Sequence, residues 1–216
     1  MNAAPTALQL AALPDGAVRR LAAHGQVRAF RKNAVVIHEG EVSEALYVIL
    51  AGRVKIFVAD GEGREMILDT LGPGDVVGEM TLDGGPRSAS VICTEPTTFS
   101  MLTQTVLREA IIASPDFALE LISTLVCRMR QATALVKSLA LLDVYGRVAA
   151  LLVKLAEVQE DGRLVVRERL TQQEIADRVG ASRDMVNRIF KELTAGGYLA
   201  VEDRRIVLTR RPPARW

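Results

Sequence analysis

The chain changes its pattern of hydrophobic and polar positions after Leu102. Between Val27 and Leu102, short apolar runs are separated by turn residues: VRAFR, AVVIHEG, ALYVIL, GRVKIFVAD, REMILDTL, RSASVICT and TTFSML. Many short strands at regular spacing are typical of a sandwich, jelly roll or barrel. The Asp60-Gly61 pair between two of the runs predicts a hairpin tip. A short helix is expected before the strands, over residues 15–24.

The following segment has helical periodicity. Pro115 can open a helix, because proline lacks an N–H and the N–H groups of a first turn have no intrahelical partner in any case. Nothing breaks the helical pattern before Leu142. Apolar residues recur along it with steps of four and three, as in a heptad seam. The seam contains Ala118, Ile122, Leu125, Met129, Ala132, Val136 and Leu139. This pattern predicts a parallel coiled-coil homodimer, and burial against the chain's own β domain is the alternative.

The seam is interrupted at Asp143, which occupies the next seam position. A second amphipathic run, GRVAALLVKLAEV, begins three residues later. We therefore expect a hinge over residues 141–146, formed by Leu141, Asp143 and Gly146. The carboxylate of Asp143 is suited to cap the helix that follows.

The segment from Thr171 onward contains two short helical patterns and a hairpin pattern. Thr171 and Glu174 have the spacing of a capping box, Gly180 suits the end of the first helix, and Ser182 suits the start of the second. The apolar face of the second helix consists of Val186, Ile189, Phe190 and Leu193. The run YLAVEDRRIVL after Gly196-Gly197 predicts two strands around a charged tip. Together these features predict a winged helix-turn-helix.

The polar face of the second helix predicts contact with DNA. Arg183 and Arg188 can donate to guanine O6 and N7, and Asp184 can accept from cytosine N4. The alternative is a solvated face on which Asp184 and Arg188 form an i, i+4 ion pair. We place the DNA contacts at Thr171, Gln172, Ser182, Arg183, Asp184, Asn187 and Arg188.

Composition and charge agree with a DNA-binding protein of two parts. The 216 residues are 49% hydrophobic and 25% charged, which is ordinary for a soluble globular protein. Residues 144–216 hold 14 Lys and Arg against 10 Asp and Glu, whereas residues 1–143 hold 13 against 16. The basic C-terminal part indicates a polyanion as partner.

The same reading of the chain places it in the cytoplasm. No apolar run approaches the ~18 residues that span a bilayer, so no membrane partner is expected. The N-terminus lacks the pattern of a secretory signal. Cys93 and Cys127 lie in apolar segments, and we expect both to be buried free thiols.

One stretch in the strand-rich part, GEMTLDGGPRSAS over residues 78–90, combines charges with turn residues. Glu79 and Arg87 lie close together in otherwise apolar sequence. Either they form an ordinary ion pair, or they bind a small anionic ligand. A buried Arg without an anion is costly unless a carboxylate such as that of Glu79 pairs with it.

Three motifs resemble the Crp/Fnr family of bacterial transcription regulators: GDVVGEM...RSASV, LALLDVYGRVA and TQQEIADRVGASRDMVNRIFKEL. The resemblance covers about Val27 to Leu208. It implies an α+β chain with an N-terminal β-roll (a double-stranded β-helix of the cyclic-nucleotide-binding type), a long dimerisation helix and a C-terminal winged helix-turn-helix. The corresponding divisions are 1–114, 115–143 and 144–216.

The resemblance also implies a ligand and partners. The ligand contacts it implies are Gly78, Glu79, Met80, Arg87, Ser88, Ala89, Ala132 and Thr133. Glu79 would accept from the ribose 2′-OH, and Arg87 would bind the cyclic phosphate. The partners implied are double-stranded DNA with a two-fold symmetric operator, a second copy of the chain, and RNA polymerase. The effector would favour the DNA-binding form of the dimer.

The base of the nucleotide is the open point. Cyclic-AMP binders of the family carry Thr-Ser where this chain has Ala132 and Thr133, so one hydroxyl is missing. Cyclic AMP is the expected effector, and cyclic GMP and cyclic di-GMP stay open. A regulator that needs no effector is a further alternative.

Other cofactors and an enzymatic function do not suit the residues. An iron–sulfur member would need several cysteines near the N-terminus, and residues 1–92 contain none. A haem or a cupin-type metal centre would need converging ligands, and the only histidines are His24 and His38. We therefore expect no metal, no haem, no iron–sulfur cluster and no enzyme.

Overall fold

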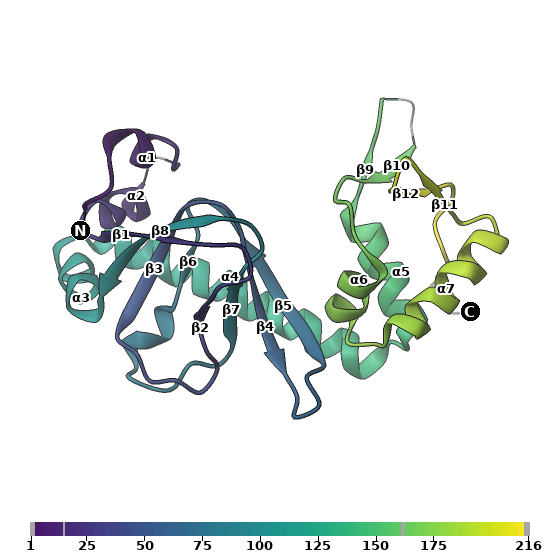
Figure 1. The fold of residues 1–216 in the computed structure, drawn as a ribbon, viewed down its shortest axis with the longest axis horizontal. Coiled ribbons are helices and arrows are strands. Elements are labelled where there is room, and N and C mark those ends of the chain that lie inside the picture. Colours follow the sequence, from purple (N-terminus) through teal and green to yellow (C-terminus); the bar gives the residue numbers. More distant parts are fainter. Residues whose placement is uncertain (1–2, 15, 161–162, 214–216) are drawn as a thin grey trace. The chain divides into compact units, whose positions relative to one another are not determined.

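A computed structural model describes residues 3–14, 16–160 and 163–213 (Figure 1). These residues fall into two compact units. The first comprises the chain up to Ala59 together with Ile67–Arg130, and the second comprises Asp60–Met66 and the chain from Gln131 onward. The tip of one hairpin and the end of the longest helix thus belong to the second unit.

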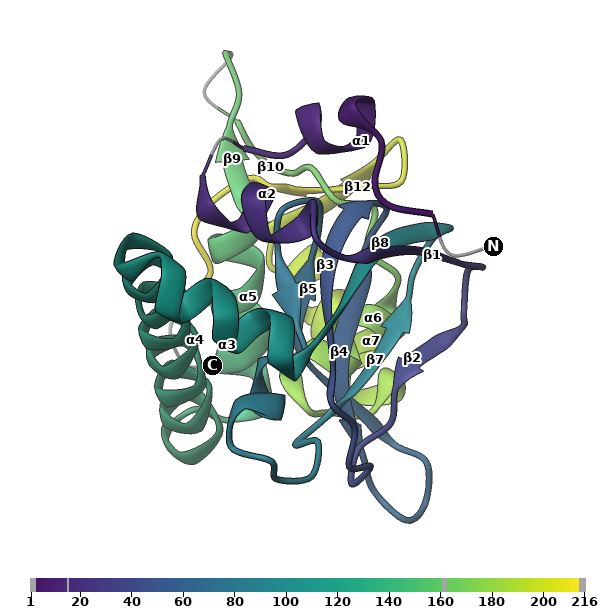
Figure 2. The ribbon, with the colours of Figure 1, turned by 90° about the vertical axis from the view of Figure 1, so that its left-hand side faces the viewer.

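The strands of the first unit form the predicted β-roll (Figure 2). They are β1 (Gln26–Phe30), β2 (Val35–Ile37), β3 (Ala45–Ala51), β4 (Val54–Ala59), β5 (Glu65–Leu71), β6 (Val76–Val77), β7 (Ser90–Cys93) and β8 (Thr97–Thr103). Two four-stranded sheets have the orders β1-β8-β3-β6 and β2-β7-β4-β5. Strands that are distant in sequence, such as β1 and β8, pair as neighbours in these sheets, and this pairing closes the roll.

The roll has an apolar interior centred on Phe99, which is fully buried. The rings of Phe30 and Tyr47 each meet it edge-on, with centroids 5.6 Å away. Edge-to-face contacts of this kind are favourable for aromatic pairs. The remaining buried members of this cluster are Ile37, Ile49, Val54, Leu71, Val77, Val91 and Cys93.

Four helices and one 3₁₀ turn accompany the strands. They are α1 (Ala7–Ala11), α2 (Ala17–Ala22), η1 (Glu79–Leu82), α3 (Gln104–Ala113) and α4 (Pro115–Leu141). The helix expected over 15–24 is α2, whereas α1 was not expected; Thr6 and Gln9 form its capping box. Among the described residues no single helix is long and apolar enough to span a membrane. Only α3 and α4 taken together pass that test, and they are bent by 117°.

Helix α4 runs unbroken as predicted, and most of its apolar seam is exposed. Its buried residues are Phe117 and Leu121, whereas Ile122 is 54% and Val136 is 64% exposed. Leu125, Met129, Ala132 and Leu139 are exposed as well. Burial against the chain's own β domain is therefore wrong as an account of these positions.

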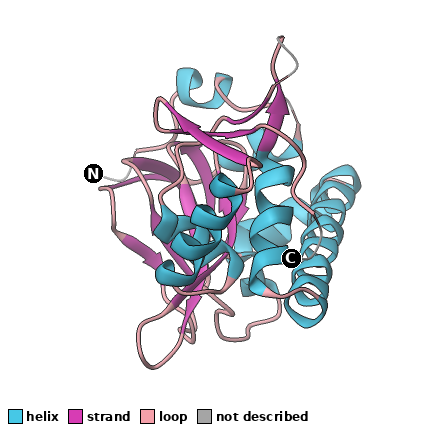
Figure 3. Cartoon of the chain, turned by 90° about the vertical axis from the view of Figure 1, so that its right-hand side faces the viewer, coloured by secondary structure: helices cyan, strands magenta, loops and turns pink. Residues whose placement is uncertain are grey.

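The second unit has the predicted helix-turn-helix and wing (Figure 3, helices in cyan and strands in magenta). Its elements are α5 (Val144–Leu155), β9 (Ala156–Val158), β10 (Leu164–Val166), α6 (Gln172–Val179), α7 (Arg183–Ala195), β11 (Leu199–Glu202) and β12 (Arg205–Leu208). One sheet has the order β11-β12-β10-β9. The amphipathic run after Asp143 is helical only as far as Leu155. Its last residues form β9 because they pair with β10, and neither strand was expected.

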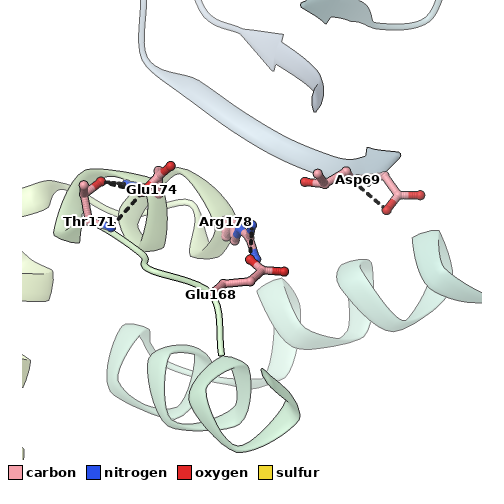
Figure 4. A network of polar contacts seen from close by, with 6 residues as sticks. Asp69, Glu168, Thr171, Glu174 and Arg178 are labelled. Carbon is pink, nitrogen blue, oxygen red and sulfur yellow. Dashed lines mark hydrogen bonds and ion pairs between the residues drawn. The ribbon is translucent and has the colours of Figure 1, made fainter. Parts of the chain in front are cut away.

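Capping residues set the helix boundaries of this unit. Asp143 accepts from the N–H of Gly146 at 2.7 Å, and Ser182 accepts from that of Met185 at 3.2 Å. Thr171 and Glu174 form the predicted capping box (Figure 4). Gly180 ends α6 with φ 62°, a left-handed conformation that suits glycine.

Candidate functional site

Arg87 is the most buried charged side chain of the stretch 78–90, with 4% of its surface exposed. Its Nη1 donates to the carbonyl oxygen of Gly78 at 2.6 Å. Its Nη2 donates to the carbonyl oxygens of Ser43 at 2.9 Å and Ala45 at 2.5 Å. Its Nε is buried and has no hydrogen-bond partner among the described residues. A buried N–H of a cation that is left without an acceptor is a place where an anion would be stabilised.

The backbone around Arg87 is fixed by the loop that precedes β3. The N–H of Arg87 donates to the carbonyl oxygen of Glu41 at 2.9 Å, and its own carbonyl oxygen accepts from Gly40 at 2.8 Å. The loop therefore holds both the main chain and the guanidinium of Arg87. Backbone carbonyl oxygens accept the three hydrogen bonds of its guanidinium, so the main chain holds the side chain in place.

Glu79 pairs with Arg128 and not with Arg87. The Oε1 of Glu79 lies 2.7 Å from the Nη1 of Arg128, and both side chains are mostly buried. Arg128 also donates from Nη2 to the carbonyl oxygen of Val76 at 2.5 Å. Of the two alternatives for this stretch, the structure does not form the ion pair between Glu79 and Arg87, because a cation from α4 takes that carboxylate and carbonyl oxygens surround the Arg87 guanidinium.

Gly78 is positioned where a side chain would collide with this arrangement. Its φ is 85°, and a Cβ there would lie 2.9 Å from the carbonyl oxygen of Ala45 and 3.2 Å from the Nη1 of Arg87. The glycine lets the backbone turn into η1 while its carbonyl oxygen accepts from Arg87. Gly78 therefore bonds to Arg87 directly before the turn that contains Glu79.

The other residues named from sequence lie at varied depth. Ala89 is buried, Ser88 is exposed and Met80 is 44% exposed. Ala132 and Thr133 are exposed and lie about one turn beyond Arg128 on α4. Arg128 was missed because no local pattern marks it; only its contact with Glu79, 49 residues away in sequence, reveals it.

The remaining titratable candidates are a tyrosine near Arg87 and the two histidines. Burial raises the pKa of the Tyr47 phenol above its ordinary value, and the guanidinium groups of Arg87 and Arg28 act in the opposite direction. His24 and His38 are exposed. The described residues contain no group of three or more His, Cys, Asp or Glu that could hold a metal ion.

The second candidate surface is the polar face of α7. Val186, Ile189, Phe190 and Leu193 are buried as predicted. Arg183, Asp184 and Arg188 are exposed, and no ion pair joins Asp184 to Arg188 in the described part of the chain. The guanidinium groups of Arg183 and Arg188 are therefore accessible to an external anion such as a nucleic acid.

Asn187 differs from its expected position on the exposed face. It is half-buried, and its Oδ1 accepts from the Nε2 of Gln172 at 3.5 Å. Thr171 and Ser182 are exposed, and each also caps a helix. In the same unit Arg178 pairs with Glu168 at 2.8 Å (Figure 4), which leaves Arg178 a structural role.

The hairpin after α7 has a tight charged tip. Asp203 and Arg204 both have positive φ, 48° and 62°, as a two-residue type I′ turn requires. Arg204 and Arg205 are exposed at this tip. The helix-turn-helix is therefore followed by a wing with a charge-balanced tip, and the two exposed guanidinium groups on it are suited to contact a nucleic-acid backbone.

Two family models match the chain over most of its length. Residues 27–114 match a cyclic nucleotide-binding domain, and residues 146–212 match a Crp-like helix-turn-helix domain. A CRP-like cAMP-activated global transcriptional regulator of Mycobacterium tuberculosis is 35% identical over 184 residues, which are 83% of this chain and 82% of that protein.

Solved structures give the same picture. The c-di-GMP responsive global regulator CLP of Xanthomonas campestris is similar with a TM-score of 0.77 and 27% identity, over 89% of this chain and 98% of that one. A CRP/FNR-family transcriptional regulator of Thermus thermophilus has a TM-score of 0.67 and 25% identity, over 85% and 93% of the two chains.

Proposed function

Because the chain belongs to the Crp/Fnr family of DNA-binding transcription regulators with a cyclic nucleotide-binding domain, we propose that cyclic AMP bound at Glu79 and Arg87 controls its affinity for a two-fold symmetric operator. Regulators of this family are not enzymes. The observation that carries the proposal is the buried Nε of Arg87, which lacks an acceptor.

The phosphate is assigned to Arg87. Its guanidinium is buried and held by backbone carbonyl oxygens, so a phosphate would meet a fixed cation and lose little entropy in ordering it. The Ser88 hydroxyl and the N–H of Ala89 follow directly in sequence and are proposed as further donors. An uncharged ligand would leave the orphan N–H and the charge of Arg87 uncompensated.

The ribose is assigned to Glu79. A carboxylate accepts hydrogen bonds only, and one oxygen of Glu79 already accepts from Arg128. The carboxylate retains acceptor capacity for a sugar hydroxyl. Arg128 is proposed to orient it and to supply additional positive charge.

The base is assigned to α4 and a second copy of the chain. The exposed seam of α4 supports a parallel dimer, in which positions e and g flank the seam and face the partner helix. Arg128 has position g and Thr133 has position e in this heptad. A partner's Thr133 is therefore proposed to approach the nucleotide that Glu79 holds, with Ala132 beside it in the seam.

Cyclic di-GMP is the second candidate effector. Ala132 lacks the hydroxyl that cyclic-AMP binders of the family carry, and the CLP regulator of similar fold is named as responsive to c-di-GMP. The two phosphates of cyclic di-GMP would suit the guanidinium groups of Arg87 and Arg128, which bond to the neighbouring residues Gly78 and Glu79. The same residues therefore predict competition between the two nucleotides if both bind.

DNA is assigned to α7 and the wing. Arg183 and Arg188 are proposed to read guanine, Asp184 cytosine, and the exposed hydroxyls of Thr171 and Ser182 to contact phosphates, with Gln172 and Asn187 beside them. In a symmetric dimer, two such helices would reach half-sites about 34 Å apart. The residues Leu141, Asp143 and Gly146 are the proposed hinge between effector and DNA regions.

The matched ranges support a division into an effector part (1–114), a dimerisation helix with hinge (115–143) and a DNA-binding part (144–216). RNA polymerase is the proposed protein partner, since the family acts on transcription. The cytoplasm is the proposed location for the same reason.

A thermal-shift and calorimetric panel tests the effector assignment. Cyclic AMP, cyclic GMP and cyclic di-GMP are added to the wild-type protein, and a ligand at 100 times its Kd should stabilise the fold by ~2.7 kcal/mol. Arg87→Lys keeps the charge but loses the planar fork, so the Kd of cyclic AMP should rise at least about tenfold. The exposed Arg53→Lys is the matched control. If none of the three nucleotides stabilises the fold or binds in calorimetry, the protein is instead an effector-independent regulator.

A further inference from the structure

Gln104, the first residue of α3, lies against the proposed effector site without belonging to it. Its side-chain Nε2 donates to the carbonyl oxygen of Thr81 at 2.5 Å. Its backbone N–H donates to the carbonyl oxygen of Glu44 at 3.0 Å. One residue is therefore bonded to two segments that are distant in sequence.

One of these segments contains Glu79, and the other holds the side chain of Arg87. Thr81 is in η1, the turn that begins with Glu79. Glu44 lies between Ser43 and Ala45, whose carbonyl oxygens accept from Arg87. Gln104 is therefore bonded both to the turn that contains Glu79 and to the loop that fixes Arg87.

Two side chains of α3 donate hydrogen bonds to the end of η1. The carbonyl oxygen of Thr81 also accepts from the N–H of Gly84 at a longer distance, 3.3 Å, so the bond from Gln104 is the one that ties this carbonyl oxygen to α3. Arg108, one turn further along α3, donates to the carbonyl oxygen of Leu82 at 3.3 Å. The first two turns of α3 thus hold the end of η1, and the shorter bond belongs to Gln104.

We propose that Gln104 is a positioning residue for the effector site, which holds the turn of Glu79 against the loop of Arg87 and so sets the preference for a ribonucleotide over its 2′-deoxy analogue. This inference rests on the proposed function. A hydrogen bond to a charged acceptor weakens steeply when its geometry is lost. The guanidinium of Arg87, which is proposed to bind the phosphate, is also held by the carbonyl oxygens of Ser43 and Ala45. Its position therefore does not depend on η1 alone.

The test compares the Kd values of cyclic AMP and 2′-deoxy cyclic AMP for the full chain. Wild type should prefer the ribonucleotide by about 10- to 100-fold, as a charge-assisted hydrogen bond implies. Gln104→Leu keeps the helix propensity and approximate shape but lacks the donor. It should reduce this preference at least about threefold, with the Kd of the deoxy analogue within about twofold of wild type.

Two additional variants and a stability check make the outcome decisive. Gln104→Met repeats the loss of the donor with a flexible side chain, in case the leucine variant fails to fold. Thr105→Val, at the exposed neighbouring position of α3, is the matched control and should keep the wild-type preference. Thermal unfolding of each variant without ligand verifies that it is folded.

The possible results separate the two proposals. A reduced ribose preference in both Gln104 variants, with Thr105→Val unchanged, supports the positioning role. An unchanged preference, or an equal loss of both nucleotides, overturns it and leaves the effector site standing. If wild type binds neither nucleotide, the proposed cyclic-AMP function is wrong and the role of Gln104 falls with it.

Discussion

Glu79 and Arg87 each keep a charge away from water, and the chain compensates the two charges differently. The carboxylate of Glu79 has a full counter-charge in Arg128 at 2.7 Å. Among the residues that the structure describes, the guanidinium of Arg87 donates to carbonyl oxygens alone, at 2.5 to 2.9 Å. Dipoles offset the desolvation of a cation less completely than an anion does. The uneven compensation leaves Arg87 as the stronger attractor for an incoming anion.

Gly78→Ala tests how tightly this residue-scale arrangement is packed. The added Cβ would lie 2.9 Å from the carbonyl oxygen of Ala45, on a backbone with φ 85°. We expect a loss of about 2–4 kcal/mol of stability, with strain and collision combined, together with weaker binding of cyclic AMP. Urea unfolding and calorimetry measure the two effects.

Gly84→Ala is the matched control, because Gly84 also has a positive φ of 73° but no atom within 4 Å of the added Cβ. It should lose only the ~1 kcal/mol of a strained backbone. Equal losses in both variants would contradict the collision and leave φ as the sole cause.

The two cysteine thiols provide a second residue-scale prediction. Cys93 is fully buried in the roll, and burial raises the pKa of its thiol; Cys127 is exposed on α4, so the expectation of two buried thiols was wrong for it. A raised pKa keeps Cys93 protonated and unreactive at pH 8, because the thiolate is the nucleophile. Titration of the native protein with a thiol reagent should therefore modify about one thiol per chain, at Cys127. Modification of both before unfolding would contradict this.

At the scale of elements, Arg147 joins the ends of two helices. From the first turn of α5, its Nε donates to the carbonyl oxygen of Val179 at 2.8 Å and its Nη1 to that of Leu142 at 2.9 Å. A longer bond, 3.4 Å, reaches Gly180. Carbonyl groups at helix ends lack intrahelical donors. One guanidinium therefore completes the C-terminal ends of α4 and α6.

Arg147→Met should loosen these ends while leaving the core intact. Each lost charged hydrogen bond contributes about 1.5–3 kcal/mol, so local opening should become at least about tenfold more frequent. Hydrogen exchange of the amides of residues 175–181 measures it. Lys154→Met, at an exposed position of the same helix, is the control and should leave the exchange unchanged. No increase in Arg147→Met would show that α6 is held by packing alone.

The elements that could be predicted from sequence are those whose signals are local. The seam of α4, the caps at Asp143, Thr171 and Ser182, and the glycine end of α6 depend on residues within one or two turns, and all were found. The strand β9 was missed because its partner β10 decides it.

The same distinction applies to the candidate site. Glu79 and Arg87 were located by the motif that contains them, whereas Arg128 and Gln104 were not. Their contacts join residues 49 and 23 positions apart, and no spacing along the chain encodes such pairs. Residues that support a site from other elements become visible only when the fold brings them to it.

At the scale of the whole molecule, effector and operator binding are expected to be coupled through the dimer. If cyclic AMP favours the conformation that fits DNA, then by linkage the operator must raise the affinity for cyclic AMP by the same factor. The exposed seam of α4 is where the two copies would be joined. A change in that seam should therefore act on both affinities together.

We expect cyclic AMP to raise affinity for an operator selected from random DNA by about 5- to 150-fold at fixed salt, and the operator to raise affinity for cyclic AMP equally. Fluorescence anisotropy and calorimetry give the two factors. Val136→Glu places a charge in the seam, 64% exposed in the single chain, and should give a monomer in sedimentation with neither enhancement. Ala134→Glu, on the outward face of the same helix, should remain dimeric with both factors intact. Unequal factors in wild type, or a Val136→Glu monomer that keeps them, would show that the coupling does not pass through the dimer.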